Sequence, residues 1–474
     1  SIIAVLVLSA VFFFSPLIYA KGSADVENNE FLDSFRQVFE FIQDNYVDEV
    51  EPEVLIEGAL KGMFKSLEDP YSAYLDEIDL RSLTDTTSGE FGGVGLYINK
   101  AIPTDDRPEI QEWVEVVSPI EGTPAFRAGL RPRDFIIAIE DEPTVDLSID
   151  EVVNRLRGVP GTVVHITILR NLKNTFEINV ERAIIEIPTV RYGGVQDDIA
   201  YLRIIQFTPL TAEKVDAAIQ DLRSQGYRNM IIDLRTNPGG LLTAAIDTAD
   251  LFFDDGLVVG TAGRIEGENQ TFHAKQGTSV EDDAQLVVLI NAGTASAAEI
   301  LAGALKDRDK AALVGETSFG KGSVQQIRRI GDGGFRLTMA KYYTPDRIFI
   351  DDVGISPDIV VKEYELSENE EKSIFAIQGE GNVDEFLDGV DNDPTAGQID
   401  SFITDLRAEG FTINDRALKR LITMRIETRL STISVFDLEY DVLLQEAVNL
   451  IRENQVESII ENRDIVGHSS AIRQ

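Results

Sequence analysis

The chain of 474 residues contains no cysteine, one tryptophan and only three histidines. Without cysteine there is no disulfide, no zinc–thiolate site and no cysteine nucleophile. The histidines are His165, His273 and His468, and they show neither metal-ligand spacing nor the context of a Ser-His-Asp triad. We therefore expect no metal site and no cofactor, and a hydrolytic reaction would need a base other than histidine.

Basic residues are scarce relative to acidic ones, 43 against 82, which gives a formal net charge of −39. A surplus of this sign disfavours nucleic acid and anionic membrane surfaces as partners. A chain of this length does not build a single core, so we expect about three or four domains.

Long apolar runs are also rare, and only one is present. Residues Ser1 to Ala20 carry no charge, and Lys21 ends the run. About 20 such residues can span a bilayer, but the run also fits the apolar region of a signal peptide. We interpret residues 1–21 as a signal peptide or an N-terminal membrane anchor, with the length slightly favouring the anchor. Both interpretations place the remaining chain outside the cytoplasm.

Hydrophobic periodicity divides the remaining chain into regions. Helical spacing of apolar residues occurs from Phe31 to Leu75 and from Ile399 to Asn462, whereas buried strands alternate with helices from Ala200 onward. The segment from Phe91 to Arg170 is typical of a compact module of strands. We expect an N-terminal helical region (28–84) that packs on an α/β core (173–362), a strand module (88–172), and an acidic linker with a C-terminal helical region (363–474).

Two segments carry candidate catalytic residues. Ser296 follows an apolar strand, Gln285 to Ile290, and precedes a small-residue helix that begins at Ala297. At such a strand-to-helix turn a hydroxyl is exposed, and amides at the helix start point toward it. Lys321 stands between two glycines, which allow backbone and ligand to approach closely. A lysine that removes the serine proton would make this a Ser-Lys hydrolase.

The amine of a catalytic lysine must be neutral, so its pKa must fall from an ordinary value of about 10.4. Burial disfavours the ammonium and supplies such a shift. Residues Ser323 to Ile330 predict a strand, and alternation would place Lys321, Ser323 and Gln325 on one face. Gln325 can then accept a hydrogen bond from the amine and orient it. A plainer interpretation, with a helix-capping serine and a solvated lysine, stays open at this point.

Two glycine-rich segments need interpretation. Met230 to Gly240 predicts a buried strand that enters a Gly-Gly turn, so the amides of Gly239, Gly240 and Ala297 are candidates for an oxyanion hole. The alternative is an ordinary strand–helix turn.

Gly315 to Gly322 nearly matches a phosphate-binding loop, but its last position is Gly instead of Ser or Thr, and a strand follows it. We therefore reject binding of ATP or GTP.

The strand module carries a candidate peptide-binding site. A glycine-rich loop precedes a strand there, and its amides can hold a C-terminal carboxylate while the strand edge accepts a peptide. The loop consists of Gly93, Val94, Gly95 and Leu96. The helix Ile149 to Leu156 is expected to form the other wall, lined by Val152 and Leu156. The alternative is a small β-domain without a ligand.

With these residues described, the chain resembles the carboxyl-terminal processing peptidases, also called tail-specific proteases. The resemblance covers roughly Phe31 to Val361 and rests on four motifs in the family's order. They are Asp69-Pro70-Tyr71-Ser72, Gly92 to Ile98 with Gly129-Leu130, Asp233 to Gly240, and the set Ser296, Lys321 and Gln325. The resemblance implies that Ser296 is the nucleophile, Lys321 the base and Gln325 the partner of the lysine.

The resemblance also implies an α/β multidomain fold with a crotonase- and ClpP-like protease core, an inserted PDZ β-domain, and helical N- and C-terminal regions. It implies a PDZ domain that binds protein or peptide substrates by their free C-termini, and a homodimer formed through the helical termini. We therefore expect a periplasmic or otherwise extracytoplasmic serine endopeptidase that cleaves near unstructured C-termini. An N-terminal anchor would attach it to the inner membrane.

Two alternatives remain beside this expectation. A catalytically inactive PDZ scaffold would keep the binding module and lose the chemistry, but the intact set of Ser296, Lys321 and Gln325 argues against it. A crotonase-like acyl-CoA enzyme would share the core layout, but a PDZ module and an export signal do not fit that function.

Overall fold

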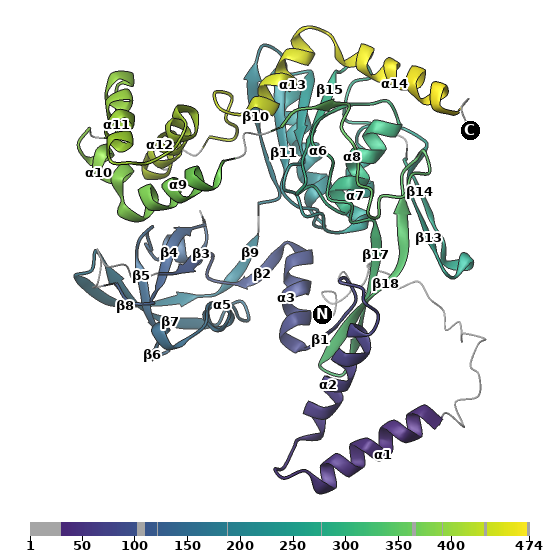
Figure 1. The fold of residues 1–474 in the computed structure, drawn as a ribbon, viewed down its shortest axis with the longest axis vertical. Coiled ribbons are helices and arrows are strands. Elements are labelled where there is room, and N and C mark those ends of the chain that lie inside the picture. Colours follow the sequence, from purple (N-terminus) through teal and green to yellow (C-terminus); the bar gives the residue numbers. More distant parts are fainter. Residues whose placement is uncertain are drawn as a thin grey trace, which may run out of the picture. The chain divides into compact units, whose positions relative to one another are not determined.

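The computed structural model describes residues 30–101, 110–120, 122–186, 188–275, 277–362, 366–390, 392–430 and 434–471 (Figure 1). The segment interpreted as a signal peptide or anchor, residues 1–21, lies outside these ranges. No helix within them is long and apolar enough to cross a bilayer. The chain forms two compact units, Ser1–Tyr74 and Leu75–Gln474.

The first unit contains two amphipathic helices, α1 (Glu30–Asn45) and α2 (Pro52–Lys65), as the helical periodicity predicts. Proline at the first position of α2 suits a helix start, because that position needs no N–H donor. Neither helix has a buried residue. Phe41 is 68% exposed and Val54 62% exposed, so large apolar side chains of both helices are exposed. The short strand β1 (Ala73–Leu75) ends this part of the chain.

The second unit begins with α3 (Glu77–Ser88), whose first turn is capped by the Asp76 side chain. A two-stranded sheet follows, in which β2 (Glu90–Gly93) pairs antiparallel with β9 (Ala183–Glu186). β2 precedes the strand module in the sequence and β9 follows it. The module is therefore an insertion between these two paired strands.

The strand module is a sheet in the order β3-β4-β5-β7-β8, with β6 paired to β5. Alternate residues of its strands, such as Val164, Ile166 and Ile168, are fully buried and form the core. Its elements are β3 (Leu96–Lys100), β4 (Val114–Pro119), α4 (Pro124–Arg127), β5 (Phe135–Ile139), β6 (Glu142–Pro143), the 3-10 turn η2 (Thr144–Asp146), α5 (Ile149–Leu156), β7 (Val163–Arg170) and β8 (Asn174–Glu181).

The α/β core, which corresponds to the predicted region 173–362, is built on a second sheet in the order β10-β11-β12-β15-β16-β19. Only the pairing of β10 with β11 is antiparallel, and the other pairings are parallel. Its strands are β10 (Val190–Gln196), β11 (Ile199–Ile204), β12 (Asn229–Asp233), β15 (Leu286–Ile290), β16 (Ala312–Gly315) and β19 (Ile359–Val360). Every residue of β15 is buried, as expected for a parallel strand covered on both faces.

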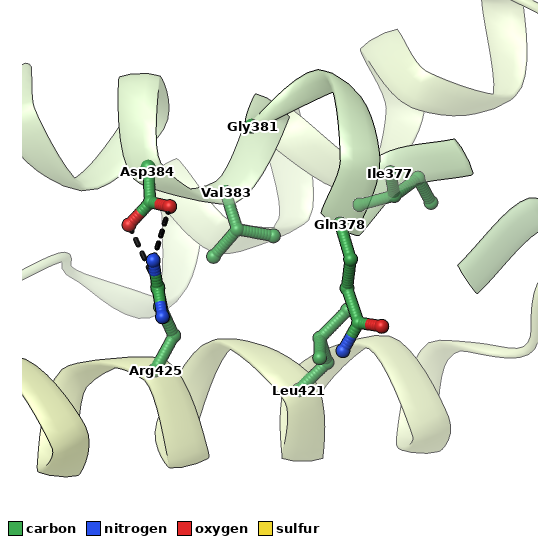
Figure 2. Close-up of a pocket in the computed structure, with 7 residues that line it drawn as sticks. All are labelled: Ile377, Gln378, Gly381, Val383, Asp384, Leu421 and Arg425. Carbon is green, nitrogen blue, oxygen red and sulfur yellow. Dashed lines mark hydrogen bonds and ion pairs between the residues drawn. The ribbon is translucent and has the colours of Figure 1, made fainter. Parts of the chain in front are cut away.

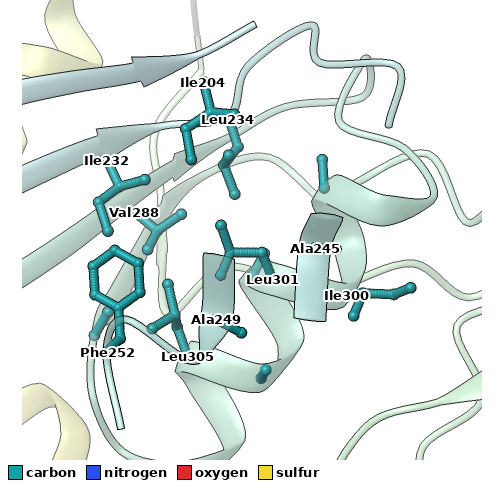
Figure 3. Close-up of a cluster of buried hydrophobic side chains, with 14 of the residues drawn as sticks. Ile204, Ile232, Leu234, Ala245, Ala249, Phe252, Val288, Ile300, Leu301 and Leu305 are labelled. Carbon is teal, nitrogen blue, oxygen red and sulfur yellow. The ribbon is translucent and has the colours of Figure 1, made fainter. Parts of the chain in front are cut away.

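Helices cover both faces of this sheet. Ile232 and Val288 pack into a cluster with the helices α6 (Thr211–Ser224), α7 (Leu242–Ala249) and α8 (Ala297–Asp307), part of which is drawn in Figure 3. Their sequence neighbours Ile231 and Val287 point to the opposite face, where they pack with α13 (Val442–Arg452). The alternation of side chains along each strand therefore produces two separate hydrophobic clusters.

A third sheet contains a long hairpin of β17 (Ser323–Ile330) and β18 (Gly333–Tyr343). The strand β13 (Leu257–Gly263) pairs with β18 and with β14 (Thr271–His273), and a 3-10 turn, η3 (Glu266–Glu268), joins β13 to β14. Residues 335–343 make up most of β18.

The C-terminal region is helical, as predicted. The helices α9 (Glu368–Glu380), α10 (Asn382–Asp388), α11 (Ala396–Ala408) and α12 (Asp415–Leu430) surround their own apolar cluster. Ile377 and Leu387 are fully buried, so part of the acidic segment forms a core. Beyond it, α13 packs on the sheet of the α/β core and α14 (Val456–Ala471) follows.

Candidate active site

Ser296 is the residue between β15 and α8, as the sequence predicts, and it has an unusual backbone conformation. Its φ of 54° and ψ of −116° lie outside the regions that L-residues favour. Such strain persists only where the surrounding structure enforces it, and it is typical of functional sites. The side chain is half-buried, so the hydroxyl is not enclosed in the core.

Glu299 fixes the turn that holds Ser296. Its side chain is completely buried and accepts hydrogen bonds from the amide of Ser296 (2.8 Å), the amides of Gly320 (2.7 Å) and Lys321 (2.9 Å), and the hydroxyl of Ser318 (2.6 Å). The amides of Ser296 and Lys321 donate to the same oxygen, Oε2. Two segments far apart in sequence are therefore joined through one carboxylate atom.

The sequence analysis did not identify Glu299. The available signal was its position three residues after Ser296, since a serine followed by glutamate at this spacing forms a capping box at a helix start. Burial raises the pKa of the Glu299 carboxyl, and the hydrogen bonds from Ser318 and from the amides of Gly320, Ser296 and Lys321 act in the opposite direction. A buried carboxylate is thus stabilised by dipoles instead of by a cation.

Lys321 is half-buried, and the pKa of its amine is lowered, which is the direction that a general base needs. Burial lowers the pKa of Lys321 below its ordinary value, and the positive charge of Arg336 lowers it further. The negative charge of Glu299 acts in the opposite direction. The direction of the net shift agrees with the expectation from the sequence that burial would favour the neutral amine.

The strand after Lys321 has the predicted bounds, Ser323 to Ile330. Lys321 lies in the irregular segment before β17, so the prediction that it shares the strand's alternation with Ser323 and Gln325 is wrong. The cause is Gly320, whose φ of 86° turns the chain out of the extended conformation. Ser323 and Gln325 do share a face, because the Gln325 amide donates to the Ser323 hydroxyl over 2.7 Å.

The candidate oxyanion residues lie beside Ser296. A Cβ added to Gly239 would be 2.7 Å from the Ser296 Cβ and 2.9 Å from the amide nitrogen of Ala297, so only glycine fits there. The amide of Gly239 donates to the Asn237 side chain over 2.9 Å. In the described part of the chain, the amides of Gly240 and Ala297 have no such acceptor. Of the three predicted residues, these two offer amides that are not already used.

Asp233 and Arg235 form a buried ion pair. Arg235 donates to both oxygens of the buried Asp233, and Tyr201 also donates to Asp233 over 2.6 Å. Although burial alone would raise it, the hydrogen bonds and charge of Arg235 hold the pKa of Asp233 below its usual value. Arg235 also binds both oxygens of Asp441, whose carboxylate accepts from the Leu444 amide at the start of α13. The C-terminal segment is thereby attached directly to the strand that leads to Gly239.

The glycine-rich loop of the strand module joins two sheets. Gly93 ends β2 and Leu96 begins β3, with Val94 and Gly95 between them. The carbonyl of Val94 accepts from the Ala125 amide over 2.9 Å, and Gly95 has a φ of 80°, which favours glycine. The loop is therefore anchored through its carbonyls in a fixed shape.

The proposed peptide groove has an open strand edge. β3 is the end strand of its sheet among the described strands, so its outer edge can pair with an added peptide. The two α5 residues predicted to line the groove, Val152 and Leu156, are instead 0% and 4% exposed and belong to the core. Ile149 and Val153 are the half-buried apolar residues of α5. The helix buries the centre of its apolar stripe and leaves the edges accessible.

The cavity in Figure 2 lies in the C-terminal helical cluster and has a volume of about 160 Å³. It is lined by Ile377, Gln378, Gly381, Val383, Asp384, Leu421 and Arg425. Arg425 and Arg429 both bind Asp384, so the charge in this cavity is paired. None of the candidate catalytic residues lines it.

Comparison with known proteins gives three family matches. Residues 198–361 match the model described as Peptidase family S41, and residues 115–170 match a PDZ domain. Residues 17–78 match the activating protease CtpB N-terminal domain. The matched ranges correspond to the protease core, to most of the strand module, and to a region that includes α1 and α2.

The chain is similar to carboxy-terminal processing proteases over about three quarters of its length. It is 40% identical to the carboxy-terminal-processing protease of Bartonella bacilliformis over 366 residues, which cover 75% of this chain and 82% of that protein. It is 35% identical to the carboxy-terminal processing protease CtpA of Bacillus subtilis, with coverage of 72% and 71%. The solved photosystem II D1 C-terminal processing protease is 27% identical to this chain. The match covers 71% of this chain and 94% of that protein, with a TM-score of 0.42.

Proposed function

Because the chain belongs to peptidase family S41, a family of serine-type peptidases that includes the carboxy-terminal processing proteases, we propose that it is an extracytoplasmic serine endopeptidase with a Ser-Lys mechanism. Its substrates are proteins with unstructured C-termini, which are cleaved near those termini. The observation that carries the proposal is the shared carboxylate oxygen of Glu299, which accepts from the amides of both Ser296 and Lys321.

In the proposed reaction, the neutral amine of Lys321 takes the proton of the Ser296 hydroxyl as the serine oxygen attacks the substrate carbonyl. The oxyanion is stabilised by the amides of Gly240 and Ala297. The peptide C–N bond then breaks, and the Lys321 ammonium returns the proton to the leaving amine. Water attacks the acyl-enzyme with Lys321 again as the base, which releases the new C-terminus and regenerates Ser296.

The lowered pKa of Lys321 supports this role, because a lysine of ordinary pKa is almost entirely charged at neutral pH. Gln325 is proposed to orient the amine. Its own amide is held by Ser323, which would fix the glutamine side chain in one orientation.

The PDZ domain is proposed to bind the C-terminus of the substrate. The open edge of β3 supports the addition of a peptide strand, and the fixed loop at Val94 and Gly95 supports the binding of its carboxylate. The partly exposed Ile149 and Val153 of α5 would then contact the apolar side chains of the peptide.

The mechanism is tested with a folded reporter domain that carries an unstructured C-terminal tail. Ser296→Ala and Lys321→Ala should each lower the rate of tail cleavage by about 10³-fold or more, measured by mass spectrometry of the products. Lys275→Ala, at an exposed lysine of the same domain, is the matched control and should retain the wild-type rate. If the wild-type chain bound the tail and cleaved no faster than Ser296→Ala, the inactive PDZ scaffold would be the better interpretation.

The location outside the cytoplasm is proposed from the apolar run at residues 1–20. Deleting residues 1–21 should move the protein from the exported or membrane fraction to the cytoplasm of expressing cells.

A homodimer is proposed from the exposed apolar side chains of α1 and α2. Phe41→Asp should then convert a dimer to a monomer in light scattering, and a wild-type chain that is monomeric at micromolar concentration would contradict this.

A further inference from the structure

Arg336 lies in the second strand of the hairpin that follows the catalytic lysine. In the pairing of β17 with β18, Gln325 is opposite Thr338 and Ile327 is opposite Arg336. Residues opposite each other in an antiparallel pair project to the same side, and so do residues two apart in one strand. Arg336 therefore projects from the same face of the hairpin as Gln325, one pair of residues further along.

The Arg336 guanidinium has no partner in the described part of the chain. The side chain is half-buried, its Nε is buried without a hydrogen-bond partner, and it forms no ion pair. Several other arginines with mostly buried side chains are paired with carboxylates, among them Arg170 with Asp134, Arg429 with Asp384 and Arg463 with Asp358. An unpaired guanidinium at partial burial is unfavourable, and it is unexpected in a chain with 82 acidic residues.

The charge of Arg336 acts at the catalytic centre. After burial, the charge of Arg336 is the next cause that lowers the pKa of Lys321, in agreement with the position of Arg336 on the Gln325 face of the hairpin. Arg336 is a half-buried cation near the reacting groups, and no carboxylate of the described chain pairs with it. Such a cation suits the binding of an anionic group of the substrate. Guanidinium binds a carboxylate through two parallel hydrogen bonds, which gives both affinity and orientation.

We propose that Arg336 binds a carboxylate of the substrate close to the scissile peptide bond, an inference that rests on the proposed peptidase function. The carboxylate has two sources: the free C-terminus of a short tail, or an Asp or Glu side chain near the cleavage point. In either case Arg336 is a specificity-determining residue of the active site, separate from the binding of the C-terminus by the PDZ domain.

The test uses peptide pairs that differ only in one carboxylate. In the first arm, long substrates with an identical C-terminal sequence carry Glu or Gln beside the cleavage point, so binding by the PDZ domain is constant. In the second arm, short substrates end in a free acid or in an amide. The wild-type protein and Arg336→Met are compared by kcat/KM on each pair, and Arg328→Met, at an exposed residue of the same hairpin, is the matched control.

We expect the wild-type protein to prefer the carboxylate member of at least one pair by about tenfold, and Arg336→Met to lose that preference through KM. Both proteins are compared on the pH plateau of kcat/KM, above the acid limb set by Lys321, where the neutral member should be cleaved at similar rates. The arm in which the preference is lost identifies the source of the carboxylate. Any preference due to the PDZ domain survives in Arg336→Met. An unchanged preference in both arms, or an equal loss on both members of each pair, would overturn the proposal.

Failure of the proposed function gives a different result. In that case the wild-type protein cleaves none of the peptides. Binding of the same peptides to the Ser296→Ala protein, with and without Arg336→Met, is then measured by fluorescence anisotropy. A weaker affinity for the carboxylate peptides alone in the Arg336→Met background would still support the carboxylate site, and equal affinities would reject it.

Discussion

Two buried carboxylates in the protease core are held in different ways. Asp233 and Glu299 are both 0% exposed. Asp233 is bound by the Arg235 guanidinium, which is also bound by Asp441. Glu299 accepts hydrogen bonds from three backbone amides and one hydroxyl, and no arginine binds it among the described contacts.

The difference follows from what lies beside each carboxylate. Through Arg235 and Asp441, Asp233 connects the central sheet to the C-terminal helix α13. Asp233 has no role in the proposed reaction, so a full ion pair at this position affects only the stability of the connection. Glu299 lies beside Lys321, whose amine must be neutral in the proposed mechanism. Amide dipoles stabilise the Glu299 charge in place and limit its pull on the lysine proton, whereas an exposed carboxylate pair with Lys321 would keep the amine charged.

The largest expected effect on stability comes from breaking the ion pair. Arg235→Met leaves Asp233 buried with Tyr201 as its remaining side-chain donor, so we expect the free energy of unfolding to fall by about 3–5 kcal/mol in urea denaturation. Arg308→Met removes a more exposed pair with Asp255 and serves as the control, with a loss of about 1 kcal/mol or less. Equal losses in the two variants would show that the Arg235 pair is not structurally special.

A smaller loss of stability and a larger loss of rate are expected for the other carboxylate. Glu299→Gln replaces one accepting oxygen with an amide donor. Where that oxygen is Oε2, the amides of Ser296 and Lys321 both lose their acceptor, at a cost of about 1–3 kcal/mol. Because Ser296 and Lys321 then lose their common anchor, kcat should fall by about 10²-fold with little change in KM. Glu316→Gln, at a half-buried glutamate of the following loop, is the control. A variant that lost stability but kept its kcat would reject the positioning role.

The smallest expected effect is a shift of the pH profile. The charge of Arg336 lowers the pKa of Lys321, so Arg336→Met should raise that pKa relative to the wild-type protein. The amine is then protonated up to a higher pH, and the acid limb of kcat/KM on a neutral peptide should move to higher pH. Arg328→Met should leave the limb in place, and a shift toward lower pH would contradict the assigned direction.

The sequence predicted the elements of the site better than the contacts between them. Ser296 at the end of a buried strand, the glycines at 239 and 240, and the inserted strand module were all visible in local patterns. The position of Lys321 outside β17 was not, because it depends on the left-handed turn at Gly320. The burial of Val152 and Leu156 was also missed, because a helical stripe does not reveal which of its residues the sheet covers.

By itself, the sequence predicted the burial of the core strands and identified Ser296 and Lys321 as candidates for Ser-Lys chemistry, since periodicity and turn residues act over a few neighbours along the chain. Only the tertiary structure decided that Ser296 and Lys321 share one buried carboxylate, that Asp441 reaches Arg235, and that Arg336 remains unpaired. These are contacts between segments far apart in the sequence, and they form only when the sheets and helices pack together.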